Sequence, residues 1–264
     1  ELKRKEIDYI IDLHRNIRSH RVRFALKKMT MTLNKLNIRK WVLVNFKKDL
    51  LPEVQIADRY LESLKYFRVV NDGKGLDYFI PEHERQESAA LIRELVKPYA
   101  VIAVGGGHNT KQIPAEKIAQ IIKGLKTNIV MLGGIEDLPK SEEILRLVRH
   151  PSLLNLTGRL SLNQSALVVE GASYIITPDS GIMHIAAAFR KNILSVWGST
   201  VPKFGFFPYM PGKESQLFEV TDLSCRPCSK IGFSSCPKRH FRCMLEQDYT
   251  EIIKKAGSLS GITE

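Results

Sequence analysis

Apolar runs of strand length alternate with helix-length amphipathic segments over most of the chain. The segments between the runs repeat apolar positions every three or four residues, as Ile118, Ile121 and Ile122 do, which predicts helices. Strands that alternate with helices predict an α/β fold, in which a parallel sheet carries helices on both faces. After residue 96 the runs typical of buried strands are Tyr99–Val104, Asn128–Leu132, Leu153–Leu156, Tyr174–Ile176 and Asn192–Trp197.

The first 95 residues show the same alternation less regularly. Gly73 and Pro81 mark Asp72–Pro81 as a linker or a short edge strand. We therefore expect two domains, residues 1–95 and residues 96–264. In the first domain the predicted strands are Ile7–Leu13 and Trp41–Phe46, and the predicted helices are Asn16–Lys28, Glu53–Leu64 and Glu84–Leu95.

Glycine-bearing turns follow four of the predicted strands. Because ligands of parallel sheets bind beyond the carboxyl ends of the strands, these turns indicate one binding site. The chain lacks the G-x-x-x-x-G-K-[ST] and G-x-G-x-x-G motifs, which argues against a P-loop nucleotidase and against a nicotinamide-dependent dehydrogenase. The four turns are Gly105–Gly107, Gly133-Gly134, Asp179–Gly181 and Gly198–Thr200.

The turn at Asp179–Gly181 carries the most specific signal. It joins a buried strand to a helix, where Asp and Ser are common N-cap residues. Free backbone N–H groups and the helix dipole favour an anion there, most often a phosphate. His184 follows about one helical turn later and can face the same ligand. Simple capping of the helix is the alternative interpretation.

The chain is strongly basic, with a formal net charge of +12 over 264 residues. Such a charge favours anionic partners, such as nucleic acid, a phosphorylated glycolipid or an acidic membrane surface. No window approaches the apolar length of a transmembrane helix. The basic residues are dense near the start, where a solvated helix face is an equal alternative; they include Arg15, Arg18, Arg21, Arg23, Lys27 and Lys28.

Four cysteines lie close together near the end of the chain, at Cys225, Cys228, Cys236 and Cys243. The first two form a C-x-x-C pair, but the second pair is spaced more loosely around His240 than zinc modules require. We therefore favour ordinary thiols or disulfides over a structural zinc site.

Several segments together resemble glycosyltransferase family 9, which contains the bacterial ADP-heptose:lipopolysaccharide heptosyltransferases. Asp179–Ala188, followed by Val196–Thr200, resembles the signature of the family. Gly107–Lys117 resembles its K-x-W-P-x-E-K/R element, with Ile in place of Trp, and Met131–Glu136 resembles its LGGPxE element without the Pro. Ile10–Ser19 is similar to the IDLHGNLRS run, and the Cys225 to Cys243 segment is similar to a C-terminal pattern of some members.

The resemblance implies a GT-B architecture, with two Rossmann-like domains facing a cleft. Residues 1–95 would be the remainder of the N-terminal acceptor domain, and residues 96–264 would bind the nucleotide-sugar. The family implies an inverting, metal-independent transfer of heptose from ADP-heptose to the inner core of lipopolysaccharide. Its probable general base, an Asp in an S-x-x-G-D loop, has no counterpart here, so we expect that loop to precede Glu1. A catalytically inactive, sugar-nucleotide-binding member is the alternative.

For the donor, the resemblance implies phosphate contacts from Lys111, which would also stabilise the leaving diphosphate, and from Asn109 and Thr110. Ser180 and Gly181 would offer N–H groups to the phosphate while Asp179 accepts hydrogen bonds from sugar hydroxyls, and His184 would hold the phosphate or the sugar. Two further positions complete the expected donor site: Glu136 for the ribose and Leu160 for the adenine ring, although a core role for the leucine is the stronger interpretation.

On the acceptor side, Asp12, His14, Arg15 and Arg18 follow a strand end and would meet the anionic lipid A/Kdo glycolipid. The implied enzyme is a monomer, peripheral to the cytoplasmic face of the inner membrane, with no cofactor and no nucleic-acid partner. Two rivals stay open: a related glycosyltransferase with another nucleotide-sugar, and a basic nucleic-acid-binding protein with zinc at its cysteines.

Overall fold

The computed structural model describes residues 2–260, and the chain forms two compact units. The first unit runs to Lys74 and also includes Lys203–Phe206. The second comprises Gly75–Pro202 and continues from Phe207. Each unit has its own sheet, in which all strand pairs are parallel.

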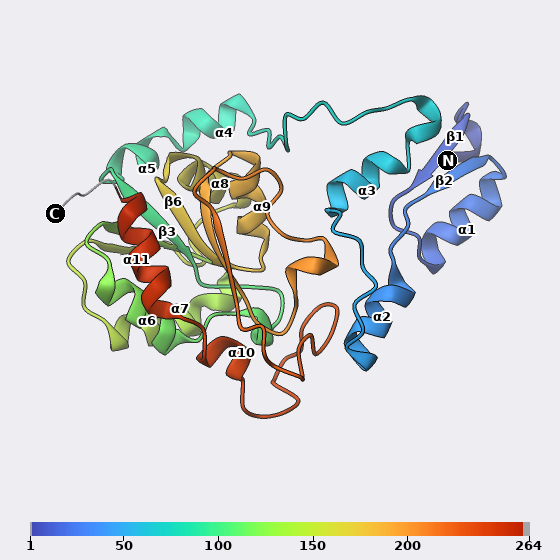
Figure 1. The fold of residues 1–264 in the computed structure, drawn as a ribbon. Helices are drawn as coiled ribbons and strands as arrows, with labels where there is room; N and C mark the ends of the chain where they lie inside the picture. Colours follow the sequence, from blue (N-terminus) through green and yellow to red (C-terminus); the bar gives the residue numbers. More distant parts are fainter. Residues whose placement is uncertain (1, 261–264) are drawn as a thin grey trace. The chain divides into compact units, whose positions relative to one another are not determined.

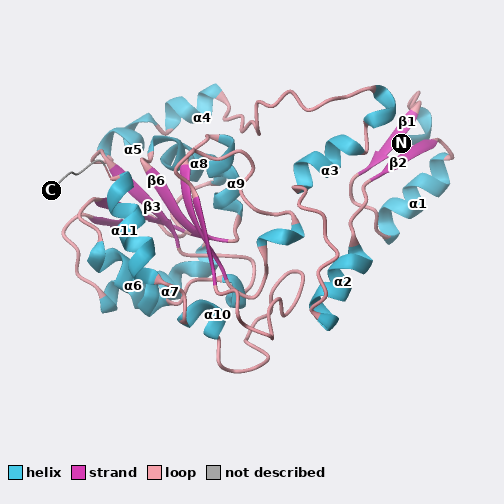
Figure 2. Ribbon diagram, in the orientation of Figure 1, coloured by secondary structure: helices cyan, strands magenta, loops and turns pink. Residues whose placement is uncertain are grey.

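The sheet of the second unit has the strand order β5-β4-β3-β6-β7-β8. Its two central strands, β3 and β6, are labelled in Figure 2. The chain builds outward from β3 to β5 and then returns to place β6 on the other side of β3, so the strand order reverses between β3 and β6. Such a reversal is where open α/β sheets bind ligands. The strands are β3 (Tyr99–Ala103), β4 (Asn128–Leu132), β5 (Leu153–Asn155), β6 (Tyr174–Pro178), β7 (Asn192–Trp197) and β8 (Gln216–Glu219).

Helices of the second unit pack in two groups, one on each side of the sheet (Figure 1). One group contains α6 (Ala115–Gly124), α7 (Leu138–Leu147) and α11 (Tyr249–Leu259). The other contains α4 (Glu82–Glu87), α5 (Ala89–Glu94), α8 (Leu162–Gly171) and α9 (Gly181–Ala188). Short helical turns complete this unit: η3 (Asn109–Lys111), η4 (Ile135–Asp137) and α10 (Arg242–Leu245), with η5 (Pro202–Phe204) at its junction with the first unit.

Burial of apolar side chains on both faces holds the central strands in place. Every residue of β3 and β6 is buried, as expected for parallel strands covered by helices on two sides. On one face, Ile102 and Ile176 pack with Ile118 and Ile121 of α6 in a single apolar core. The strand ends at the switch point are therefore fixed by a rigid scaffold.

The first unit is smaller and more open. Its strands β1 (Tyr9–Asp12) and β2 (Met29–Thr32) pair in parallel through α1 (Ile17–Leu26), whose residues are all exposed or half-buried. The unit also contains η1 (Leu2–Arg4), α2 (Asn37–Phe46), α3 (Ile56–Glu62) and η2 (Lys65–Phe67).

The fold class predicted from the sequence is confirmed, but two N-terminal elements differ. The predicted strand Trp41–Phe46 is wrong, because this run is the second half of α2. Short apolar runs do not separate strand from helix by period alone, and here the buried positions Lys40 and Leu43 lie three residues apart, as on one face of a helix. The second strand is instead Met29–Thr32, and the predicted helix Glu84–Leu95 is interrupted at Ser88.

No helix within residues 2–260 combines the length and the apolar character that crossing a bilayer requires.

Candidate functional site

A cavity of about 430 Å³ opens at the switch point between β3 and β6. We call it the switch-point cavity. Its walls come from the ends of β3, β4 and β6 and from the first turns of α8 and α9. Four donor residues predicted from the sequence line it, together with Gly105–Gly107, Gly133 and Gly134; they are Glu136, Leu160, Ser180 and Gly181.

Two glycine residues of the wall, Gly105 and Gly133, are packed closely against Asp137. A Cβ atom on Gly105 would lie 1.9 Å from Oδ2 of Asp137. Asp137 is buried and accepts a hydrogen bond from the Gly134 N–H at 2.9 Å. Burial is the main cause that raises the pKa of Asp137. The glycines thus leave the cavity wall as bare backbone, with a buried carboxyl group beneath it.

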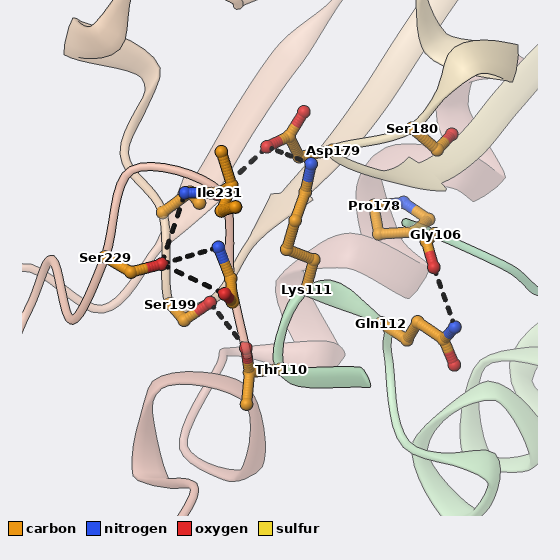
Figure 3. A network of polar contacts seen from close by, with 12 residues as sticks. Gly106, Thr110, Lys111, Gln112, Pro178, Asp179, Ser180, Ser199, Ser229 and Ile231 are labelled. Carbon is orange, nitrogen blue, oxygen red and sulfur yellow. Dashed lines mark hydrogen bonds and ion pairs between the residues drawn. The ribbon is translucent and has the colours of Figure 1, made fainter. Parts of the chain in front are cut away.

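Lys111 and Asp179 form an ion pair beside this wall, with Nζ 2.8 Å from Oδ2 (Figure 3). The same Oδ2 accepts a hydrogen bond from Thr200 Oγ1 at 3.0 Å. Both side chains of the pair are largely enclosed, which strengthens their attraction relative to a surface pair. Gly232, with φ +96°, packs against the stem of Lys111, where a Cβ would lie 3.1 Å from Cγ. The ion pair is therefore held from several sides.

The N-terminus of α9 faces the switch-point cavity without a side-chain cap. Ser180 is the N-cap residue, but its hydroxyl lies 2.8 Å from Thr177 Oγ1. Thr177 already donates its one hydroxyl hydrogen to the Pro178 carbonyl, so Ser180 must be the donor in this contact. Ser180 therefore does not cap the first N–H groups of α9, and the residues that carry them, Gly181 and Ile182, line the cavity.

His184 lies one turn into α9, within electrostatic range of both members of the ion pair. Burial lowers the pKa of His184 below its usual value, and Lys111 adds to this effect while Asp179 opposes it. The imidazole is therefore neutral at physiological pH, and a bound anion would raise its pKa.

Asn109 and Thr110 have other surroundings than the switch-point cavity. The Thr110 hydroxyl donates to the Phe233 carbonyl and accepts from the Phe233 N–H at 2.7 Å. It also accepts from Ser199 Oγ at 2.9 Å (Figure 3). One donor and two acceptor positions are thereby used, so this hydroxyl fastens the 229–233 loop to the end of β7. Asn109 lines a separate cavity of about 640 Å³ together with Cys236 and Arg239.

The cysteine-bearing segment braces the end of β7. Arg226 is buried and donates to the carbonyl oxygens of Gly198 and Thr200, and its guanidinium pairs with Glu219 at 2.7 Å. Gln247 Nε2 donates to the Trp197 carbonyl at 3.0 Å. These contacts fix the loop from which Thr200 reaches Asp179.

The four cysteines are free thiols in the structure. Cys225 Sγ lies 3.8 Å from His240 Nε2, and burial raises the pKa of Cys243 to about 12. Among residues 2–260 we find no group of three or more His, Cys, Asp or Glu side chains arranged to hold a metal ion. In the structure this segment contributes the contacts that brace the end of β7.

In the first unit, Asp12 holds the turn between β1 and α1. Its carboxylate accepts the N–H groups of His14 at 3.0 Å and Arg15 at 2.6 Å and the Ser19 hydroxyl at 2.8 Å, and it pairs with Arg23 at 3.5 Å. Burial opposes ionisation, but these hydrogen bonds and the Arg23 charge outweigh it, so the pKa of Asp12 is lowered. Asp12 therefore presents the exposed side chains of His14, Arg15 and Arg18.

A second cavity, of about 410 Å³, lies next to this turn inside the first unit. We call it the basic cavity, because Arg15, Lys35 and Arg39 line it together with His20. His20, Lys35 and Arg39 belong to none of the motifs found in the sequence. Their signal was weak, because Lys35 and Arg39 lie in and after a connection whose path depends on β2, which the periodicity did not predict.

Comparisons with known proteins show what this chain is similar to. The sequence profile described as "Glycosyltransferase family 9 (heptosyltransferase)" matches residues 1–255. The lipooligosaccharide heptosyltransferase 2 of Haemophilus influenzae is 24% identical over 170 residues, which are 63% of this chain and 48% of that protein. The chain thus spans about half the length of this curated relative.

Solved structures show the same fold. The glycosyl transferase family 9 structure from Veillonella parvula has a TM-score of 0.73 and 21% identity, covering 97% of this chain and 74% of that one. The Escherichia coli ADP-heptose lps heptosyltransferase II has a TM-score of 0.68 and 17% identity, covering 98% and 78%. The α/β fold is thus of the GT-B type, and the chain belongs to glycosyltransferase family 9.

Proposed function

We propose that this chain binds ADP-heptose in the switch-point cavity and belongs to a heptosyltransferase that acts on the inner core of lipopolysaccharide. The observation that carries the proposal is the Lys111–Asp179 ion pair, which lies beside a glycine wall and the uncapped N-terminus of α9. Cation, bare backbone and helix N-terminus together are the groups that a nucleoside diphosphate needs.

The diphosphate would interact with Lys111 and with the N–H groups of Gly181 and Ile182. As the glycosidic bond to the diphosphate breaks, negative charge grows on the leaving oxygen. A preorganised ammonium group and oriented amides stabilise that charge more than they stabilise the bound donor, and this difference accelerates transfer. Because these groups can carry out this stabilisation, we propose that the donor is activated without a metal ion.

Asp179 would orient the sugar rather than the phosphate. Both of its contacts within the protein use Oδ2, so we assign Oδ1 to accept hydrogen bonds from heptose hydroxyls. Glu136 and Leu160, which line the same cavity, would contact the ribose hydroxyls and the adenine ring. His184 would donate to a phosphate or sugar oxygen.

The acceptor is proposed to be an anionic lipid A/Kdo glycolipid. His14, Arg15 and Arg18 follow the Asp12 turn, and Arg15, Lys35 and Arg39 surround the basic cavity. Guanidinium groups bind phosphate and carboxylate in a bidentate manner. The net charge of +12 also supports contact with an anionic membrane surface, which we propose to be the cytoplasmic face of the inner membrane.

Inversion at the anomeric carbon requires a single displacement, with a general base that removes the proton of the acceptor hydroxyl. In the family that base is an Asp in an S-x-x-G-D loop, for which this sequence has no counterpart. Donor binding can therefore be measured directly on this chain. Transfer of the sugar has to be measured on a protein that carries such a loop.

Isothermal titration of the chain with ADP-heptose, GDP-mannose and a UDP-sugar, each with and without EDTA, tests the donor. We expect ADP-heptose to bind at least tenfold more tightly than the other two, with no change on chelation. Equal affinity for all three would contradict the assigned nucleotide, and loss of binding in EDTA would contradict metal independence. A loop-bearing homologous protein should then convert ADP-heptose with inversion, as product analysis by NMR would show.

A further inference from the structure

Two residues outside the predicted donor site support the glycine wall from behind. Gln112 Nε2 donates to the Gly106 carbonyl at 2.9 Å (Figure 3). The Oε1 atom of the same amide accepts from Lys140 Nζ at 3.1 Å, and Nζ also donates to the Val104 carbonyl at 3.2 Å. This row of hydrogen bonds, from Lys140 through Gln112 to Gly106, therefore links α7 to the end of β3.

Through the geometry of the peptide bond, the hydrogen bond between Gln112 and Gly106 affects the switch-point cavity. In a trans peptide the carbonyl and the following N–H point in opposite directions. Because Gln112 draws the Gly106 carbonyl back into the protein, the N–H of Gly107 points away from Gln112. Gly106 and Gly107 both line the switch-point cavity, so this N–H is directed toward the space where we place the diphosphate.

Lys140 decides which way the Gln112 amide lies. A charged ammonium group only donates, so it selects the Oε1 atom and leaves the NH₂ group for Gly106. A neutral amine can also accept, which permits the reversed amide, and that orientation would set two oxygens against each other at Gly106.

The surroundings of Lys140 act on its pKa in opposite directions. Burial lowers the pKa of Lys140 to about 8. The acidic groups that face it from its surroundings act in the opposite direction: Asp137 from η4, Glu143 from α7 and Glu116 from α6. The change of charge thus falls within an accessible pH range.

We propose that Gln112 and charged Lys140 are positioning residues, which turn the Gly106–Gly107 peptide so that the Gly107 N–H binds the donor diphosphate. The inference rests on the proposed function, because it concerns the same cavity. It predicts that loss of either side chain weakens diphosphate binding selectively, and that the two losses are not additive.

The test compares Gln112→Met, Lys140→Met, the double variant and Lys123→Met, an exposed lysine of α6, as control. Titration uses ADP, inorganic pyrophosphate and adenosine as probes. We expect each single variant and the double variant to bind ADP and pyrophosphate about tenfold more weakly, with adenosine unchanged and the control equal to the unaltered chain. Gln112→Glu keeps the volume and the Lys140 contact, and we expect the same selective loss even if a methionine variant folds poorly.

The pH profile adds a signature that a purely structural role would not give. ADP affinity of the unaltered chain should fall about threefold as the pH rises through 8, and this fall should be absent in Lys140→Met. Equal loss of adenosine and pyrophosphate, or no loss in Gln112→Glu, would overturn the inference while leaving the proposed function intact. Failure of the unaltered chain to bind ADP would instead overturn the proposed function.

Discussion

Asp12 and Asp179 occupy equivalent places in the two units, yet they are used differently. Asp12 is the last residue of β1 and Asp179 directly follows the last residue of β6, and each precedes a turn into a helix. Asp12 is bound by groups close in sequence, between His14 and Arg23. Asp179 is bound by Lys111 and Thr200, which come from other strand ends. A carboxylate bound by its own turn stabilises that turn, whereas one bound by distant groups marks a place where several elements converge.

The electrostatics of the two carboxylates support this distinction. Two backbone N–H groups, one hydroxyl and an arginine surround Asp12, which is the pattern of a turn and helix cap. A single long side chain balances Asp179, and a ligand can draw that side chain away. Because a diphosphate offers more negative charge than one carboxylate, Lys111 can exchange partners when the donor binds.

The largest expected effect comes from removing the cation at Asp179. Lys111→Met should reduce ADP affinity about a hundredfold, since a charge-assisted contact to the diphosphate is lost and Asp179 stays enclosed without its partner. Isothermal titration measures it, with Lys123→Met as the matched control. A change of less than threefold would remove Lys111 from the donor site.

The next effect concerns stability in the first unit. Asp12→Ala should lower the free energy of unfolding by about 2 kcal/mol, because it removes several hydrogen bonds of a buried carboxylate. Hydrogen exchange at the His14 and Arg15 amides should accelerate, and ADP affinity should stay the same. Weakened ADP binding in this variant would contradict the division of labour between the two aspartates.

A smaller change should separate sugar from phosphate at Asp179. Asp179→Asn keeps the shape of the side chain but weakens its acceptance of sugar hydroxyls, so ADP-heptose affinity should fall about tenfold. ADP itself should bind as well as before, or more tightly, because Lys111 is released from its ion pair. If both ligands lose affinity equally, the carboxylate acts on the site as a whole and not on the sugar.

The smallest effect is an acid dependence confined to the first unit. The pKa of Asp12 is lower in the folded chain than the unfolded value of about 3.9, so its stabilising contribution is present above that value and is lost as the pH falls through the folded pKa. Hydrogen exchange of the His14 amide between pH 5 and pH 2.5 measures the loss. In Asp12→Asn this part of the pH dependence should disappear.

The periodicity of the sequence predicts the strands and helices of the second unit well, because each follows from a pattern of neighbouring residues. The bounds of β4 match the predicted Asn128–Leu132, and β7 spans the predicted Asn192–Trp197. The prediction of a strand at Trp41–Phe46 was wrong because this hydrophobic run is short, and it is helical only in the context of the first unit. The small core of that unit left its elements less strongly patterned.

The site itself was predictable only in part. Lys111, Asp179, Ser180 and Gly181 were found from motif and turn chemistry, and the structure brings them together. Contacts between residues far apart in the sequence leave no local motif that would predict them. Lys140, for example, lies 28 residues from its partner Gln112. The role of Asp12 did have a local signal, since Asp commonly accepts backbone N–H groups two and three residues later.

Arg226 and Gln247 have a practical consequence for anyone who wishes to screen inhibitors against a shortened protein. The sheet is complete at Glu219, so a designer guided by strands alone would stop there. In such a fragment the backbone oxygens of Trp197, Gly198 and Thr200 would lose the hydrogen bonds that these two side chains donate. A useful screening fragment must therefore extend beyond Gln247, even though this final stretch adds no strand.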